Sequence, residues 1–223
     1  MIRLIFRLYS IAQGALFVFG SEWNQFRGNS GQGHATNELP FKWSNVSSNL
    51  HWRTSIEGKA WSSPILADNM VVVTNSRTSL HNKSLFLEVL ALEGNSGDIV
   101  WKNTLFSYSD MPRIHQKNSY ASPTPFFDGD SIYVHFGNLG TARITKTGKV
   151  LWKKVFDYSP VHGGGSSPII YADLLLFSAD GATDPCIYAI DKNNGEVVWK
   201  RKRSSNAKKN FSFCTPLIVS RGK

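Results

Sequence analysis

Short apolar runs alternate along this chain with turns built from Asp, Asn and Gly. Three of these runs are rich in β-branched, aliphatic and aromatic residues, and they span Met70–Thr74, Ile132–Phe136 and Leu174–Phe177. A further run follows each of them, at Leu87–Leu92, Ala142–Thr145 and Ile187–Ile190. Their length and composition are those of strands, and no segment sustains a helical period. The pattern predicts an all-β protein made of antiparallel hairpins.

The last strand of each unit carries one phrase, Gly-x-Val/Ile-x-Trp-Lys, which begins at Gly97, Gly148 and Gly195. Trp101 and Trp152 are 51 positions apart, and Trp152 and Trp199 are 47 apart, close to the period of propeller blades. The glycine supplies the positive φ that a short hairpin loop needs. Because side chains alternate along a strand, each Trp is expected to share a face with the Val or Ile two positions before it, and to pack between neighbouring sheets.

A second signature opens each unit, at Ser62–Ile65, Ala121–Thr124, Ser166–Ile169 and Cys214–Leu217. Four strands therefore lie between one opening and the next, which is the content of one antiparallel propeller blade. The alternative is a β-sandwich in which the Trp residues are ordinary core aromatics. A sandwich has no reason to repeat one phrase at the same point of each unit, so we expect a β-propeller of four-stranded antiparallel blades.

The repeat count indicates an N-terminal portion of a ring, with about three full blades and partial ones. Leu50–Arg53 imitates the Trp-bearing strand, with Trp52 lying 49 positions ahead of Trp101, and is expected to be an orphan last strand. The chain stops just inside a fourth unit, whereas closed rings have four to eight blades. We expect the ring to close with C-terminal blades that are not present here.

The first residues differ in character from the rest. Residues 1–20 have Arg3 and Arg7 ahead of a short apolar run, which is the pattern of a signal peptide and is too short to span a bilayer. The alternative is a cytosolic protein with a frayed N-terminus. We expect an exported protein, periplasmic or on the cell surface, without a transmembrane segment. Residues 21–42 are then an N-terminal extension, and residues 43–223 form the partial propeller domain.

The composition, with 41% hydrophobic residues, supports a packed core. The net charge of +9 includes five cations between Arg201 and Lys209, which leaves four; we interpret that run as a solvated loop. Because no nucleic-acid-binding motif accompanies it, no nucleic-acid partner is expected. Cys186 and Cys214 fall on strands that are not neighbours, which favours two free thiols, although an oxidising compartment would permit a bridge.

The phrase Ala-x-Asp-x-x-x-Gly-x-x-x-Trp-Lys is complete at Ala189–Lys200, and the other two units match it in part. In this phrase the chain resembles the pyrroloquinoline-quinone (PQQ)-like repeat family of β-propellers, from about Trp43 to its end. The segment Trp23–Gly28 is similar to the Trp-x-Gln-Phe-Arg-Gly start of large exported bacterial proteins with such repeats.

The resemblance implies two different functions. In quinoprotein alcohol dehydrogenases such a propeller holds PQQ and calcium, with a catalytic Asp and a pair of adjacent cysteines. In the propeller lipoprotein of the outer-membrane assembly machinery, the same repeats bind partner proteins and no cofactor. Here Cys186 and Cys214 are 28 positions apart, so no residue of the dehydrogenase site carries over.

Ligands of propellers usually sit on the axis or on the face of the loops that enter the innermost strands. Those loops are Ser107–Tyr120, Ser159–Gly165 and Ser204–Phe213. They supply the candidate ligand-binding residues His115, Lys117, Asn118, Tyr120, His162, Lys208 and Lys209. Together these would form a cationic mouth suited to an anionic small molecule or glycan. The alternative is that they cap blades and hydrogen-bond the loop backbone.

No metal site is expected. His115 and His162 are 47 positions apart without tight ligand spacing, and Asp180 and Asp184 are expected to serve a turn. No catalytic motif is present. The sequence therefore favours an exported, non-catalytic scaffold that binds a protein or another ligand without a cofactor. The alternative is a PQQ-dependent dehydrogenase acting on an alcohol or sugar, with most cofactor residues in the missing C-terminal part.

Overall fold

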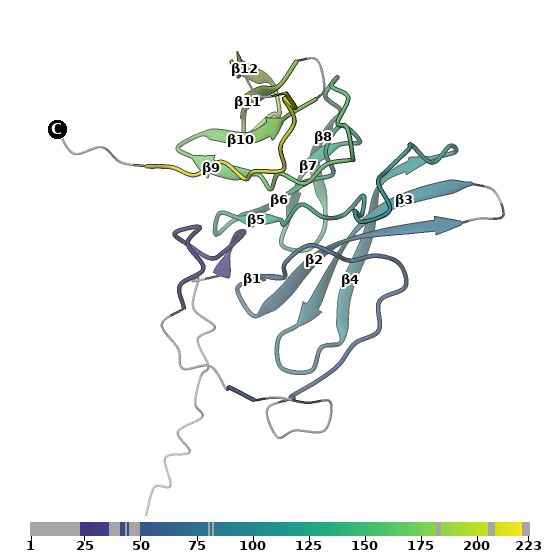
Figure 1. Cartoon of the computed structure of the whole chain (residues 1–223). Coiled ribbons are helices and arrows are strands. Elements are labelled where there is room, and N and C mark those ends of the chain that lie inside the picture. Colours follow the sequence, from purple (N-terminus) through teal and green to yellow (C-terminus); the bar gives the residue numbers. More distant parts are fainter. Residues whose placement is uncertain are drawn as a thin grey trace, which may run out of the picture.

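A computed structural model of the chain describes residues 23–35, 41–42, 44, 50–79, 81, 83–181, 184–204 and 208–219. The expected signal peptide at 1–20 lies outside the described residues. Three four-stranded antiparallel sheets, ordered β1-β2-β3-β4, β5-β6-β7-β8 and β9-β10-β11-β12, succeed one another along the chain, and we call them blades 1, 2 and 3 (Figure 1). Among the described residues, no helix is long and apolar enough to cross a membrane.

The strands of blade 1 are β1 (Ile65–Ala67), β2 (Met70–Ser79), β3 (Ser84–Glu93) and β4 (Ile99–Tyr108). Blade 2 contains β5 (Phe126–Phe127), β6 (Ser131–His135), β7 (Thr141–Thr145) and β8 (Val150–Lys154). Blade 3 contains β9 (Ile169–Tyr171), β10 (Leu174–Ala179), β11 (Cys186–Asp191) and β12 (Val197–Lys202). The predicted all-β fold of four-stranded antiparallel blades is confirmed, and the three described blades do not close a ring (Figure 1).

A β-bulge lies inside every Gly-x-Val/Ile-x-Trp phrase. In blade 1, Trp101 pairs with Ala91 and Ile99 pairs with Leu92, so that Val100 is the extra residue. The equivalent extra residues are Leu151 and Val198. Because paired residues share a face and Ala91 and Leu92 are consecutive, Ile99 and Trp101 point to opposite faces. The prediction that they share a face was wrong, because two-residue alternation does not allow for the bulge.

The two faces of each blade make the core between blades. The face that carries Trp points to the next blade, and the face that carries the paired Val or Ile points to the previous one. Between blades 1 and 2, one buried cluster joins Ile65, Val72 and Ala91, with Trp101 packed on it, to Phe127, Ile132 and Ile144, with Val150 packed on it. Between blades 2 and 3, Phe126, Tyr133 and Trp152 are joined to Leu175 and Ile190. Burial of these rows supplies the hydrophobic stabilisation of the arc.

Each of these Trp side chains also bonds to the hairpin turn of the following blade. The indole Nε1 of Trp101 donates to the carbonyl oxygen of Lys146 over 2.8 Å, and that of Trp152 donates to the carbonyl oxygen of Lys192 over 2.9 Å. A Cβ placed on Gly148 would lie 2.9 Å from Cε3 of Trp101. The repeated glycine therefore has two roles, since it adopts a positive φ and leaves room for the indole of the preceding blade.

The predicted orphan strand at Leu50–Arg53 pairs with no other strand in the described part of the chain. Its side chains nevertheless act as those of β4 do. Trp52 Nε1 donates to the carbonyl oxygen of Gly94 over 2.8 Å, and Thr54 Oγ1 donates to that of Gly97. Trp52 packs on the cluster that covers the first face of blade 1. The indole of Trp52 thus contacts the β3–β4 turn although Trp52 itself is not part of a sheet in the described part of the chain.

The opening of the second unit lies two residues later than predicted. Counted across the sheet from the Trp position, Phe126 corresponds to Ile65, so Thr124 corresponds to Ser63. The prediction of Ala121–Thr124 was wrong, because Ser122-Pro123 and Thr124-Pro125 are two overlapping copies of the same signal.

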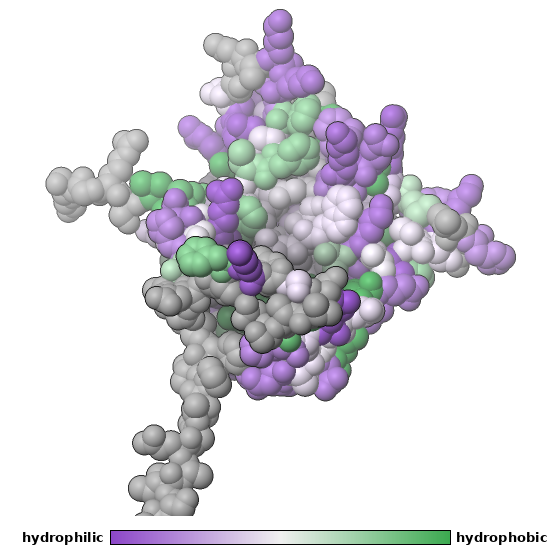
Figure 2. Space-filling view, turned by 60° about the horizontal axis from the view of Figure 1, so that its bottom comes forward, coloured by the Kyte–Doolittle hydropathy of each residue, from purple (hydrophilic) through white to green (hydrophobic). Residues whose placement is uncertain are grey.

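Hydroxyl groups at these openings link the innermost segments of successive units. The Ser63 amide donates to Thr124 Oγ1 over 3.1 Å, and the Thr124 amide donates to Ser167 Oγ over 2.9 Å. The Ser167 amide donates to Thr215 Oγ1 over 3.1 Å, which places the segment 213–219 beside β9 (Figure 1). This segment ends in the exposed apolar residues Leu217, Ile218 and Val219, and it projects at the left of Figure 2.

Candidate functional site

The loops that enter the innermost strands gather on one edge of the blades. Because successive strands run in opposite directions, the loops after β4, β8 and β12 emerge on the same edge as the β6–β7 and β10–β11 loops. We call this edge the loop face. All seven candidate residues from the sequence lie on its loops, at 109–125, 155–168 and, where the structure describes the third loop, 203–204 and 208–214.

The loop face brings two of the predicted histidines together. The rings of His115 and His162 meet edge to face, with centroids 4.8 Å apart. Asn118 fixes this contact, because its Nδ2 donates to the carbonyl oxygens of His162, over 2.9 Å, and Gly164, over 3.1 Å. His115 and His162 come from loops of different blades, so the linear sequence could not show that they touch.

The third loop adds two aromatic rings to the pair. Phe211 meets His162 edge to face at 5.1 Å, and Phe213 stacks at 6.4 Å. Phe213 is 45% exposed and the neighbouring Val161 is 41% exposed. His115, His162, Phe211 and Phe213 form what we call the aromatic cluster. Sequence reasoning missed the two phenylalanines, although their place beside Lys208 and Lys209 in the same loop was a usable signal.

The remaining candidates differ in their surroundings. Lys117, Lys208 and Lys209 are exposed, and none of them forms an ion pair within the described part of the chain. The Tyr120 hydroxyl donates to the carbonyl oxygen of Pro112, and burial raises the pKa of this tyrosine. Asn118 and Tyr120 therefore bond the loop backbone, as the alternative interpretation of these residues expects.

A buried histidine lies behind the loop face and was not predicted. His135 is fully buried, with Nδ1 2.8 Å from Thr141 Oγ1 and Nε2 3.3 Å from the Tyr158 hydroxyl. Its ring lies 4.3 Å from that of Phe177. Burial lowers the pKa of His135 to about 3, so the ring is neutral at physiological pH. Within the sequence this residue appears as one more position of a strand.

The predicted turn acids behave differently from each other. Asp180 is buried and accepts from Arg203 Nε and Nη2, over 2.9 and 2.7 Å, and from Ser212 Oγ over 2.7 Å. Asp184 is exposed and pairs with Lys200 and Lys202 at 3.3 Å. Arg203 was expected in a solvated loop, and that expectation was wrong because Asp180 holds it against the β10–β11 loop.

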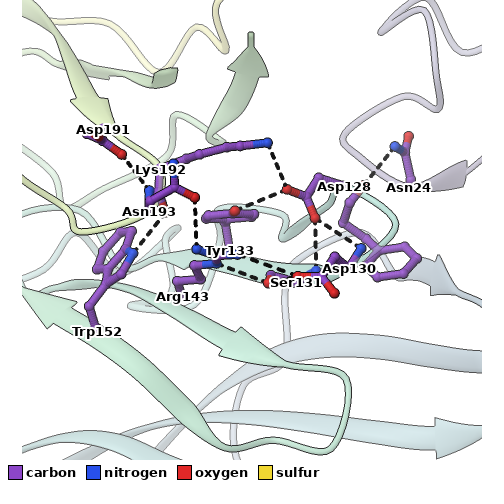
Figure 3. A network of polar contacts seen from close by, with 11 residues as sticks. Asn24, Asp128, Asp130, Ser131, Tyr133, Arg143, Trp152, Asp191, Lys192 and Asn193 are labelled. Atoms are coloured by element: carbon purple, nitrogen blue, oxygen red, sulfur yellow. Dashed lines mark hydrogen bonds and ion pairs between the residues drawn. The ribbon is translucent and has the colours of Figure 1, made fainter. Parts of the chain in front are cut away.

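Polar contacts on the opposite edge fasten blade 2 to blade 3 (Figure 3). Lys192 Nζ lies 3.2 Å from Asp128 Oδ2, which also accepts from the Tyr133 hydroxyl over 3.1 Å. Burial would raise the pKa of Asp128, but the amides of Ser131 and Asp130 together with Lys192 lower it. Lys146 and Asp68 form the equivalent pair between blades 1 and 2 at 2.6 Å. The polar side chains of this edge therefore hold neighbouring blades together.

A site for PQQ and calcium would need suitable ligands among the residues present. Cys186 is buried and Cys214 is exposed, and they are unpaired, so they do not form the adjacent pair that the quinoproteins use. Among the described residues, no three His, Cys, Asp or Glu side chains gather as metal ligands. The buried carboxylate of Glu88 already faces Lys102 at 3.1 Å and Arg77 at 3.3 Å. The described residues thus show neither an adjacent cysteine pair nor a group of metal ligands.

Comparison with solved structures shows the propeller fold. A quinohemoprotein alcohol dehydrogenase from Pseudomonas putida matches 69% of this chain at 18% identity, with a TM-score of 0.50 over 22% of its own length. A europium-containing methanol dehydrogenase matches 64% at 18% identity, with a TM-score of 0.47 over 24% of its length. BamB from Moraxella catarrhalis matches 72% at 12% identity, with a TM-score of 0.42 over 56% of its length.

The chain thus spans about a quarter or less of the two dehydrogenases and about half of that BamB. At these identities the likeness concerns the fold alone. No curated protein matches the chain. The family model described as outer membrane protein assembly factor BamB matches residues 35–163 and again residues 86–221. Since these matches cover most of the chain, it belongs to this family of PQQ-like repeat β-propellers.

Proposed function

We propose that this chain is part of an exported, non-catalytic scaffold that binds a protein partner or an anionic ligand at its loop face. The aromatic cluster is the observation that carries the proposal. It combines two imidazoles with Phe211 and the half-exposed ring of Phe213, and Val161 extends its apolar surface. Exposed apolar surface with a polar rim is typical of interaction sites.

The charges around the cluster favour an anionic partner. Arg113, Lys117, Lys208 and Lys209 are exposed on the loop face, and they form no ion pairs within the described part of the chain. Unpaired cations around an apolar centre raise the association rate of negatively charged partners and disfavour positively charged ones.

A photo-crosslinking experiment tests the surface. A benzophenone amino acid is placed at Phe213 or, as a matched control, at Val198, an apolar residue that is 55% exposed on the outer strand of blade 3. In the intact cell envelope, Phe213 is expected to give one discrete crosslinked partner and Val198 none. Equal crosslinking at both positions would mean that the aromatic cluster has no special role.

Two further measurements test the rest of the proposal. Calorimetric titration of PQQ and calcium into the full-length mature protein is expected to show no stoichiometric tight binding, and such binding would overturn the non-catalytic assignment. For export, residues 1–22 are fused to a phosphatase that is active only after secretion. A fusion that remains inactive in the cytosol would refute export.

A further inference from the structure

A small cavity opens on the loop face where three loops meet. Its volume is about 200 Å³, which is smaller than the roughly 300–1,000 Å³ of pockets that hold whole small ligands. The loop after β4 supplies Pro112, Arg113 and Tyr120, the β6–β7 loop supplies Phe136, Asn138 and Leu139, and the loop after β8 supplies Ser159, Pro160, Gly163 and Gly164. All three loops belong to the described blades, so the cavity does not depend on residues outside them.

The walls of the cavity are fixed by contacts already described and by close glycine packing. A Cβ on Gly164 would lie 2.8 Å from Cα of Gly137, and a Cβ on Gly163 would lie 2.9 Å from Cγ1 of Ile114. Asn118 holds the carbonyl oxygen of Gly164, and the hydroxyl of Tyr120 is bonded within its own loop. The cavity is therefore preformed, and a ligand would not have to order it.

Arg113 is the one charged side chain among the residues that line the cavity. It has no ion pair within the described part of the chain, whereas Arg77, Arg143 and Arg203 each reach a carboxylate. The amide of Asn138 is a further polar group at the wall, and the other lining side chains are uncharged. A guanidinium beside an uncharged cavity is suited to bidentate recognition of a planar carboxylate.

We infer that this cavity binds a carboxylate, supplied by an Asp or Glu side chain of the protein partner. The inference rests on the proposed function and names the chemistry of its contact. In this proposal Arg113 donates to the carboxylate, and Asn138, which lines the same cavity, supplies a second donor. The size favours the source, because about 200 Å³ is below the roughly 300–1,000 Å³ of pockets that take up a whole small ligand, whereas a single acidic side chain needs less room.

A titration followed by NMR tests the inference on the full chain labelled with ¹⁵N-glycine. The probe is N-acetyl-glutamic acid α-amide, and N-acetyl-glutamine α-amide is its neutral isostere. The acid is expected to shift the amide signals of Gly163 and Gly164 to saturation, whereas the isostere does not. In R113Q the Kd is expected to rise at least tenfold. The control variant R201Q loses the same charge at an exposed arginine of β12 that does not line the cavity, and its Kd is expected to change less than twofold.

Each contrary result is decisive. Equal binding of acid and isostere, or equal weakening in R113Q and R201Q, would overturn the carboxylate pocket. Tighter binding of glucuronate than of the blocked glutamate would overturn the assignment to a protein side chain. Unchanged Gly163 and Gly164 signals in free R113Q show that this variant is folded. The F213S variant is expected to bind the probe normally, so failure of the pocket is distinguishable from failure of the aromatic cluster as a partner surface.

Discussion

Replacing Gly148 with Ala tests whether the joint between blades is the contact of an indole with a glycine turn. Gly148 has φ 82°, and an added Cβ would lie 2.9 Å from Cε3 and 3.0 Å from Cδ2 of Trp101. Both atoms belong to the indole ring, whose Nε1 donates a hydrogen bond to the carbonyl oxygen of Lys146. The indole therefore has little freedom to retreat, and the hairpin turn must move away from blade 1.

Two penalties contribute to the expected loss of stability. The left-handed backbone conformation costs about 1–2 kcal/mol for a residue with a Cβ. Overpacking against Trp101 adds about 1–3 kcal/mol. The free energy of unfolding should thus fall by about 2–5 kcal/mol, a large fraction of the 5–15 kcal/mol typical of a domain. Urea unfolding followed by tryptophan fluorescence and by circular dichroism measures this loss as a shift of the midpoint.

Gly129 offers a matched control. It has φ 97°, and nothing lies within 4 Å of the position of its Cβ, so Gly129→Ala should lose only the backbone part, about 1–2 kcal/mol. Adding Trp101→Leu to Gly148→Ala should relieve the overpacking and give a coupling energy of about 1–3 kcal/mol. Equal losses in Gly148→Ala and Gly129→Ala, together with strict additivity in the double variant, would refute the role of this contact.

Three further changes probe the buried polar groups. His135 is held neutral, with a folded pKa of about 3 against an unfolded pKa of about 6.5. Its contribution to the free energy of unfolding is therefore present above about pH 6.5 and is lost, at about 1.4 kcal/mol per pH unit, as the pH falls toward 3. H135Q should flatten this dependence of stability on pH in urea titrations at different pH, and an unchanged slope would contradict the prediction. D180N should cost about 3 kcal/mol of unfolding free energy by leaving Arg203 unpaired, whereas the exposed D184N should leave the urea midpoint nearly unchanged; equal midpoints in the two variants would contradict this. W152F removes the indole donor to the next blade and should cost about 1–3 kcal/mol in the same assay, and a loss within error of zero would show that this bond is dispensable.

The repeat predicted the blades because packing of Trp between sheets imposes the same residues at the same point of every unit. It did not predict the bulge at Val100, since one inserted residue leaves the sequence pattern intact and reverses the face of Ile99. It also placed the second opening at Ser122 instead of Thr124, because both precede proline and only strand register separates them. Local pattern therefore fixed the elements, and pairing fixed their faces.

The candidate site was predictable as a set of loops and not as a set of contacts. Loops that follow the Trp strands must emerge on one edge, which is why His115 and His162 were found. Their contact with each other and with Phe213 depends on the angle between blades, which the sequence does not state. The ion pair of Asp180 with Arg203 escaped prediction for a different reason: both lie in blade 3, but they are 23 positions apart and meet only when β10, β11 and β12 pair.

On one edge of the blades, recurring contacts hold neighbouring blades together, whereas the loops on the other edge differ in sequence. This difference explains where a binding site can evolve. On the edge opposite the loop face, the contacts recur from blade to blade. Trp101 and Trp152 each donate a hydrogen bond to the next hairpin turn, and Lys146 and Lys192 each pair with an acid of the preceding blade. Trp52 makes the same contact although no sheet adjoins it in the described part of the chain, so the joint needs only the indole and the turn. Because the joints hold the blades from that edge, the loops of the opposite edge are not required to repeat. The aromatic cluster and the Arg113 cavity lie on this second edge, where sequence can change to suit a partner while the arc of blades stays fixed.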